Sequence, residues 1–258
     1  MRHAELTDRL AAIVAVAPGR VSVAVRGWDG FRWDYDSTRV VPAASTIKVP
    51  IMLAYLESGM PWELPVSLPA KRVGGCGPLS LLPSVTQLPA RELLRLMIAL
   101  SDNDATNAIL GAVGYGAVSR LLMRARARHT EVRRFMMDPA AVEAGRDNVT
   151  TAANLAELLA SLRAGVLVDP RSASMALALM REQQFTEGLP AYLPAGVHCA
   201  SKTGMLPGVR HDLAIIERDD RWVVVVALAT DLMDGDIDRG TSVLGSYAAL
   251  GEAAATLV

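Results

Sequence analysis

The sequence of 258 residues predicts an α+β fold in which strands from both ends of the chain form one antiparallel sheet. Alternating apolar residues, typical of half-buried strands, occur near the N-terminus and again in the last quarter of the chain. The segment between them has helical periodicity. We therefore expect an α/β lobe made of 1–43 and 186–258, and an inserted all-α lobe made of 44–185.

The first elements are expected to be one helix and two strands. Residues 4–17 carry apolar side chains on one side of a helix that ends near Pro18-Gly19, namely Leu6, Leu10, Ile13 and Val14. Residues 20–28 alternate as a strand, and the turn Asp29-Gly30 leads to a second strand over 31–36.

The helical lobe should contain helices over 45–58, 89–100, 104–113, 116–128, 151–164 and 171–183. Three further strands are expected over 197–203, 210–218 and 221–230, with Asp219-Asp220 as a hairpin turn. An Ala-rich helix over about 240–257 completes the chain. The terminal helices should pack together on one face of a five-stranded antiparallel sheet.

The composition excludes several classes of function. The net charge of −1 lacks the basic surplus of a nucleic-acid-binding protein, and no apolar run reaches the length of a membrane span. The four histidines show no metal-binding spacing, and Cys76 and Cys199 are expected to be two buried free thiols. We expect no metal, no organic cofactor, and a small-molecule substrate as the partner.

Two of the three lysines in this arginine-rich chain lie in short motifs. Lys48 closes Ser45-Thr46-Ile47-Lys48, Lys202 opens Lys202-Thr203-Gly204, and Ser101-Asp102-Asn103 lies between them. Lysine, unlike arginine, can lose its proton when it is desolvated or placed beside another cation. A lysine one helical turn from a serine is a credible base for a nucleophile.

These three motifs, each present once and in this order, resemble the signature of class A β-lactamases and penicillin-binding proteins. The resemblance spans most of the chain and implies the fold of β-lactamases and DD-peptidases. It implies that Ser45 is the nucleophile, that Lys48 accepts its proton, and that Ser101 passes a proton to the leaving nitrogen. Lys202 completes the catalytic set.

The same resemblance implies the substrate-binding residues. Asn103 would hold the substrate amide, and Lys202 and Thr203 would bind a substrate carboxylate. The N–H groups of Ser45 and Met205 would form an oxyanion hole, and Gly204 would permit close approach of the substrate backbone. Arg210 is either a second carboxylate anchor or an ordinary surface arginine.

One part of the family pattern is missing. Class A enzymes carry a glutamate on an omega loop that activates the deacylating water, and the corresponding position here is Met136. Arg134 and Asp147 are expected to form the ion pair that braces this loop. Asp138 and Glu143 are the nearby carboxylates, and each is either a substitute water-activating base or an ordinary loop residue.

We therefore expect a serine hydrolase that forms an acyl-enzyme on Ser45 with β-lactams or related amides and esters, with weak β-lactam turnover. The alternatives are an intracellular esterase, peptidase or transacylase, or a sensor that is acylated once. Without a recognisable signal peptide we expect a cytoplasmic protein, or an exported one whose leader is missing from this sequence. A monomer or a weak dimer is expected.

Overall fold

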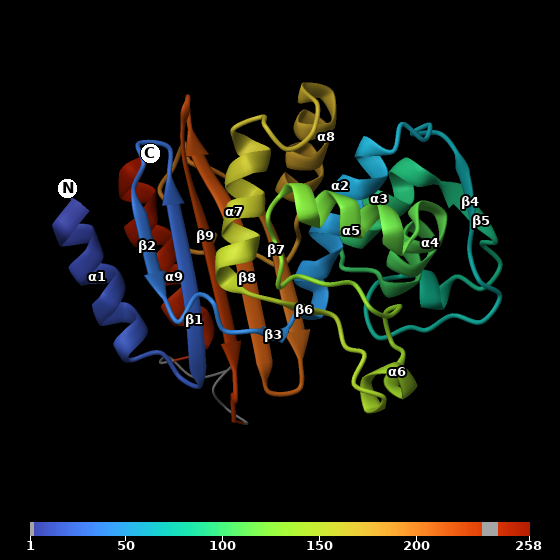
Figure 1. Cartoon of the computed structure of the whole chain (residues 1–258), viewed down its shortest axis with the longest axis horizontal. Helices are drawn as coiled ribbons and strands as arrows, with labels where there is room; N and C mark the ends of the chain where they lie inside the picture. The colour runs from blue at the N-terminus through green and yellow to red at the C-terminus, as the bar shows by residue number, and fades with distance from the viewer. Residues whose placement is uncertain (1–2, 234–241) are drawn as a thin grey trace.

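The computed structural model describes residues 3–233 and 242–258 (Figure 1). Its main sheet is five-stranded and antiparallel, in the order β2-β1-β9-β8-β7. These strands are β1 (Arg20–Gly27), β2 (Arg32–Tyr35), β7 (His198–Leu206), β8 (Val209–Arg218) and β9 (Arg221–Thr230). Because β1 pairs with β9 along its whole length, the two ends of the chain join in one sheet, and the predicted α+β class is confirmed.

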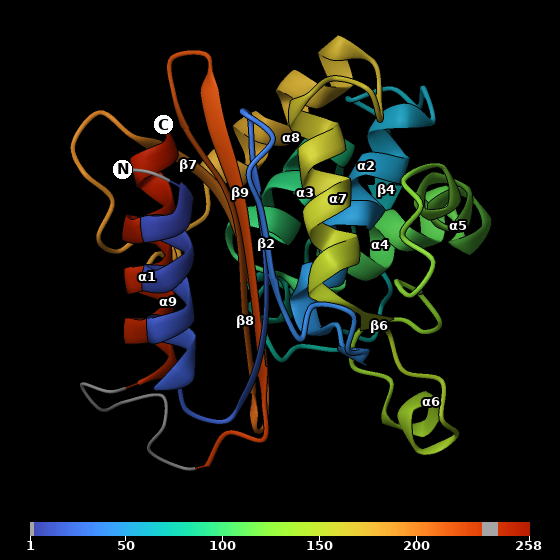
Figure 2. The same ribbon diagram turned by 60° about the vertical axis from the view of Figure 1, so that its left-hand side comes forward.

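One face of the sheet is covered by the two terminal helices. Helices α1 (His3–Ala15) and α9 (Val243–Ala254) lie side by side there, as Figure 2 shows, and a short 3₁₀ turn, η3 (Ala255–Leu257), follows α9. Leu6 and Leu10 of α1 share a buried apolar cluster with Val23 and Val25 of β1. The predicted packing is therefore confirmed, while the predicted helix start at 240 lies outside the described residues.

The other face of the sheet carries the helical segment of the chain. Its helices are α2 (Lys48–Glu57), α3 (Ala90–Ala99), α4 (Asn103–Val113), α5 (Tyr115–Arg124), α7 (Ala152–Arg163) and α8 (Pro170–Arg181). Helix α7 packs directly on β1 and β9. One apolar cluster joins the sheet residues Ile215 and Val224 to these helices. The boundaries proposed for the two lobes stay a prediction, because this core runs across them.

The central strands are buried on both faces. Along β9, Val223 and Val225 face the terminal helices, whereas Val224 and Val226 face the helical segment. Each face thus receives every second residue of the strand.

The sequence missed several short elements. These are β3 (Val41–Pro42), η1 (Ala44–Ile47), β4 (Pro65–Ser67), η2 (Leu79–Leu81), β5 (Gln87–Pro89), α6 (Pro139–Glu143) and β6 (Val149–Thr150). The expected helix over 45–58 is wrong in its first turn, because residues Ala44–Ile47 form a 3₁₀ turn and α2 begins at Lys48. Pro50 has no N–H to donate back to residue 46, so an α-helical bond is missing where the helix was expected to start.

In the part of the chain that the structure describes, no helix is long and apolar enough to cross a membrane.

Candidate active site

Ser45 lies in the 3₁₀ turn η1, between the short strand β3 and helix α2. The preceding Ala44 has a φ of 46°, a left-handed conformation that is rare for a residue with a side chain. Gly204 of β7 approaches this turn so closely that a Cβ placed on it would be 3.2 Å from the amide nitrogen of Ser45. Gly204 therefore permits close approach of the backbone of Ser45. Its predicted contact with a substrate backbone stays a prediction.

Lys48 is completely buried at the start of α2, with an exposed fraction of 0%. Its ammonium group donates to the carbonyl oxygen of Ser101 (2.6 Å), to the Oγ of Ser101 (3.1 Å) and to the Oδ1 of Asn103 (2.9 Å). Over residues 3–233 and 242–258, no hydrogen bond joins it to the Oγ of Ser45. Burial, and next the charge of Lys202, hold the pKa of Lys48 well below its ordinary value.

Lys202 of β7 is also completely buried and reaches the same serine. Its ammonium group donates to the Oγ of Ser101 at 3.1 Å and to the carbonyl oxygen of Thr203 at 2.8 Å. Burial lowers the pKa of Lys202 to about 7, against the opposing effects of Cys76 and Asp212. The two lysines thus meet at a single hydroxyl oxygen, and both favour the neutral amine more than a solvated lysine does.

The loop of Ser101 is held by its neighbour Asp102. Ser101 has a φ of 57°. Asp102 caps α4, because its Oδ1 accepts from the N–H of Ala105 (2.8 Å), and its Oδ2 accepts from the N–H of Leu79 (2.9 Å). Asp102 therefore braces the loop. Asn103, whose Oδ1 accepts from Lys48, also donates to the carbonyl oxygen of Gly74 at 2.9 Å.

Arg210 and Met205 face each other across β7 and β8, where their Cα atoms are register partners. The guanidinium of the half-buried Arg210 contacts the sulfur of the exposed Met205. Arg210 is therefore two register positions from Thr203. Its role as a carboxylate anchor stays a prediction.

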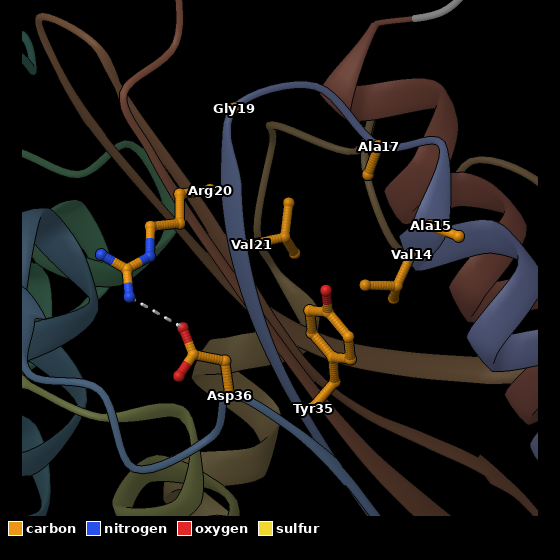
Figure 3. Close-up of a pocket in the computed structure, with 8 residues that line it drawn as sticks. All are labelled: Val14, Ala15, Ala17, Gly19, Arg20, Val21, Tyr35 and Asp36. Carbon is orange, nitrogen blue, oxygen red and sulfur yellow. Dashed lines mark ion pairs between the residues drawn. The ribbon is translucent and has the colours of Figure 1, made fainter.

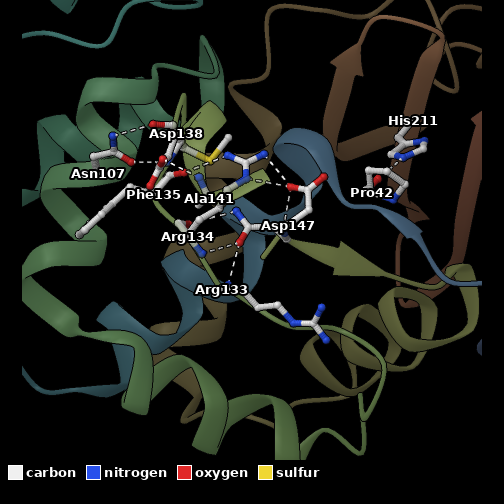
Figure 4. A network of polar contacts seen from close by, with 11 residues as sticks. Pro42, Asn107, Arg133, Arg134, Phe135, Asp138, Ala141, Asp147 and His211 are labelled. Carbon is white, nitrogen blue, oxygen red and sulfur yellow. Dashed lines mark hydrogen bonds and ion pairs between the residues drawn. The ribbon is translucent and has the colours of Figure 1, made fainter. Parts of the chain in front are cut away.

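The predicted ion pair of the omega loop is present. Arg134 and Asp147 are joined by nitrogen–oxygen distances of 2.7 and 2.8 Å (Figure 4). Asn148 ties the two ends of the loop together, a role for which its sequence position gives no signal. Its Oδ1 accepts from the N–H groups of Arg133 (2.8 Å) and Arg134 (3.1 Å).

Met136 occupies the position where the family pattern has glutamate. Its backbone N–H donates to the Oδ1 of Asn107 at 2.7 Å, and its carbonyl oxygen accepts from the Nδ2 of Asn107 at 3.1 Å. The thioether side chain is only 8% exposed. This backbone position is therefore firmly held, but its side chain cannot accept a proton.

The two nearby carboxylates differ in their surroundings. Asp138 caps the short helix α6 by accepting from the N–H of Ala141 at 3.0 Å, whereas Glu143 at the end of that helix is exposed. Asp138 thus serves as the N-cap of this helix. The water-activating role stays a prediction for both.

Both cysteines are free, as predicted, but both are half-buried rather than fully buried. Within the described ranges 3–233 and 242–258, no cluster of three or more histidine, cysteine or acidic side chains could hold a metal ion.

A separate pocket lies where the end of α1 meets the start of β1, which is separated from β7 by β9 and β8 (Figure 3). Its charged lining residues are the pair Arg20–Asp36, with 3.7 Å between nitrogen and oxygen. It shares no residue with the three motifs.

Comparison with known proteins agrees with this geometry. The chain matches the Beta-lactamase enzyme family over residues 5–249. It superposes on a β-lactamase from Sphaerobacter thermophilus DSM 20745 with a TM-score of 0.88 and 27% identity, over 97% of both chains. It superposes on PBP-A with a TM-score of 0.85 and 23% identity, over 98% of this chain and 95% of that one.

A curated relative is a β-lactamase regulatory protein, BlaB of Streptomyces cacaoi. It is 27% identical over 76% of this chain and 79% of its own length. The family match covers nearly the whole chain and includes all three motifs. The chain therefore belongs to the Beta-lactamase enzyme family.

Proposed function

We propose that this protein is a serine acyl-transfer enzyme that forms an acyl-enzyme on Ser45 with β-lactams or related amides and esters, and that it hydrolyses β-lactams slowly. The observation that carries the proposal is the pair of buried lysines that share the hydroxyl oxygen of Ser101, each at 3.1 Å. Burying two cations at one hydroxyl is costly for stability, and a proton-transfer site explains why they are there.

In the first step, neutral Lys48 takes the proton of the Ser45 hydroxyl as the oxygen attacks the substrate carbonyl. A neutral amine keeps two N–H donors and gains one lone pair. Lys48 can therefore retain two of its three present hydrogen bonds, to Ser101 and Asn103, while the lone pair turns to Ser45. The lowered pKa of Lys48 favours this state.

In the second step, the carbon–nitrogen or carbon–oxygen bond of the substrate breaks and the leaving atom needs a proton. The Ser101 hydroxyl supplies it and is reprotonated by Lys48 or Lys202, since both donate to its oxygen. The products of this step are the Ser45 ester and the protonated leaving group.

Deacylation requires a base that activates water, and Met136 supplies none. We therefore expect the acyl-enzyme to form quickly and to persist. A mutant of PBP-A has been solved as an acyl-enzyme complex with penicillin G, which supports penicillins as first test substrates here.

A second candidate function is that of a sensor that is acylated once and remains modified. It is favoured by the similarity to BlaB, described as a β-lactamase regulatory protein, and by the missing base. An esterase, peptidase or transacylase on the same scaffold remains the enzyme alternative, because the acylation machinery does not depend on Met136.

Intact-protein mass spectrometry over time, with penicillin G and a chromogenic cephalosporin, tests these functions. A covalent adduct on Ser45 that decays slowly, with several product molecules per enzyme, is the expected result. A stoichiometric adduct without turnover would favour the sensor. If the wild type forms no adduct, or if the Ser45→Ala variant forms it at the same rate, the proposal is wrong.

A further inference from the structure

His211 is a buried side chain next to the site that the proposed mechanism does not use. It lies on β8 as the register partner of Gly204, with an exposed fraction of 1%. Its Nε2 is 2.8 Å from the carbonyl oxygen of Pro42, and its Nδ1 is 2.9 Å from the carbonyl oxygen of Arg210 (Figure 4). Both ring nitrogens thus face carbonyl oxygens, although a neutral imidazole has only one N–H.

The surroundings decide which nitrogen holds that proton. Burial lowers the pKa of His211 to about 4, so the ring is neutral at pH 7. The carbonyl oxygen of Arg210 already accepts a hydrogen bond from the hydroxyl of Tyr247 at 2.8 Å. A proton on Nε2 therefore leaves both carbonyl oxygens with a donor, since Pro42 receives the imidazole N–H.

Pro42 begins the segment that carries the nucleophile. Proline has no N–H, so the carbonyl oxygen is the one backbone group through which a hydrogen bond can hold this residue. The next residue, Ala43, donates its N–H to the carbonyl oxygen of Asn148 at 2.8 Å. Then come Ala44, with its φ of 46°, and Ser45. A left-handed non-glycine residue persists only where its surroundings fix it.

We propose that His211 is a positioning residue for the nucleophile, whose Nε2–H fixes Pro42 and thereby the turn that presents Ser45. The inference rests on the proposed function, because it assigns a part in acylation at Ser45. His211 touches neither Ser45 nor substrate in this scheme. It acts through the backbone of residues 42–45, which it contacts at the carbonyl oxygen of Pro42. Gly204, on the adjacent strand β7, lies against the same turn at Ser45.

The test compares His211→Leu, which removes the donor, with His211→Gln, whose amide nitrogen can replace Nε2. The matched control is His198→Leu, since His198 is an exposed histidine on the neighbouring strand β7. Acylation of Ser45 by penicillin G is followed by mass spectrometry over a range of concentrations. This separates the dissociation constant of the non-covalent complex from the rate constant of acylation.

We expect His211→Leu to lower the acylation rate constant about 10- to 100-fold, since a displacement near 1 Å has effects of that order, with little change in the dissociation constant. His211→Gln should recover most of the loss. If folded His211→Leu acylates at the wild-type rate, or if both variants lose the same activity and the same thermal stability, the inference is wrong.

Two further measurements keep this result separate from failure of the proposed function. If penicillin G does not acylate the wild type, labelling of Ser45 by a fluorophosphonate probe replaces it in the same comparison. Nitrogen-15 NMR of the histidine-labelled wild type then reports the tautomer without any substrate. A proton on Nε2 of His211 is expected, and a proton on Nδ1 would overturn the inference.

Discussion

At the scale of single residues, the hydroxyl oxygen of Ser101 is the point where two buried ammonium groups meet. We expect Ser101→Ala to lower the rate constant of acylation by about 10²- to 10³-fold, because positioned proton transfer contributes effects of this size. Ser80→Ala is the control, since its hydroxyl makes only a 3.5 Å contact with Gly77. Mass spectrometry of the Ser45 adduct provides the rate. Acylation of Ser101→Ala at the wild-type rate would exclude Ser101 as the proton shuttle.

In the proposed mechanism, Met136 is the residue that separates acylation from hydrolysis. Met136→Glu places a carboxyl group on a backbone position that Asn107 already holds from both sides. We expect this variant to accelerate decay of the acyl-enzyme by 10-fold or more, because it supplies a general base. Met137→Glu is the matched control, since its side chain is 51% exposed. Equal acceleration in both variants would mean that any added carboxylate suffices and that position 136 has no special role.

At the scale of elements, strand β8 carries a buried carboxyl group behind the site. Asp212 accepts from the N–H of Leu189 at 2.8 Å through Oδ2, while its buried Oδ1 has no partner among the described residues. Burial raises its pKa from 3.8 to about 7. The folded protein therefore binds this proton more tightly than the unfolded chain does. Between about pH 4 and pH 7 the contribution of Asp212 to the free energy of unfolding must fall as pH rises.

Asp212→Asn should remove that dependence, because the amide resembles the protonated acid at every pH. Relative to the wild type, we expect the variant to gain about 2.5 kcal/mol between pH 5 and pH 8, because a slope of about 1.4 kcal/mol per pH unit acts over the two units below the pKa of about 7. Urea unfolding of both proteins at the two pH values measures it. Lys202, with its pKa lowered to about 7, contributes the opposite slope above pH 7. Because the charge of Asp212 raises the pKa of Lys202, Asp212→Asn lowers that pKa further, and the slope from Lys202 then begins at a lower pH and adds to the relative gain of the variant. If the difference in the free energy of unfolding between the two proteins is the same at pH 5 and pH 8, Asp212 is ionised in the folded state.

The omega loop depends on one amide side chain at its end. The buried Asn148 accepts from the N–H groups of Arg133 and Arg134, and donates to the carbonyl oxygen of Arg134 at 3.2 Å. Asn148→Ala leaves these groups without partners, and we expect it to lower the free energy of unfolding by about 2–3 kcal/mol. Asn154→Ala, which removes an exposed bond to His129, should cost less in the same urea experiment. Equal losses would contradict a special role for Asn148.

These elements also show how far the sequence could lead. Long segments such as β1, β9 and α7 were predictable from their sequence patterns. Valine recurs at every second position of β1, β9 is an uninterrupted apolar run, and leucine recurs once per turn of α7. The first turn of α2 was not, because the missing N–H of Pro50 removes an α-helical bond without specifying a 3₁₀ turn, and the residues that contact this turn and the residue before it, Gly204 and Asn148, are distant in sequence. The motifs predicted Ser45, Lys48, Ser101 and Lys202 as site residues, whereas His211 and Asn107 carry no local signal. Their importance arises only from the backbone groups that the fold brings to them.

At the scale of the whole molecule, the sheet lies between two apolar cores and contributes buried residues to both. Residues of β9 alternate between the cluster under the terminal helices and the cluster under the helical segment. Two groups of ion pairs join the sheet to the helical segment. Arg26 of β1 is 2.7 Å from Glu157 of α7, and Glu217 of β8 binds Arg163 of α7 and Arg181 of α8. A substitution that destabilises either core should therefore also destabilise the strands that both cores share.

This arrangement predicts that the two lobes unfold together, although their chain boundaries can be drawn at 43/44 and 185/186. Trp62 packs against the helical cluster, and Trp33 packs against the cluster on the opposite face of the sheet. Two variants, each keeping one of these tryptophans and carrying phenylalanine at the other three positions, report the cores separately. For each variant, we expect the urea midpoint measured by tryptophan fluorescence to equal the urea midpoint measured by far-UV circular dichroism. Separate midpoints for the two probes, each with a smaller denaturant slope, would instead mean that the helical segment is an independent domain.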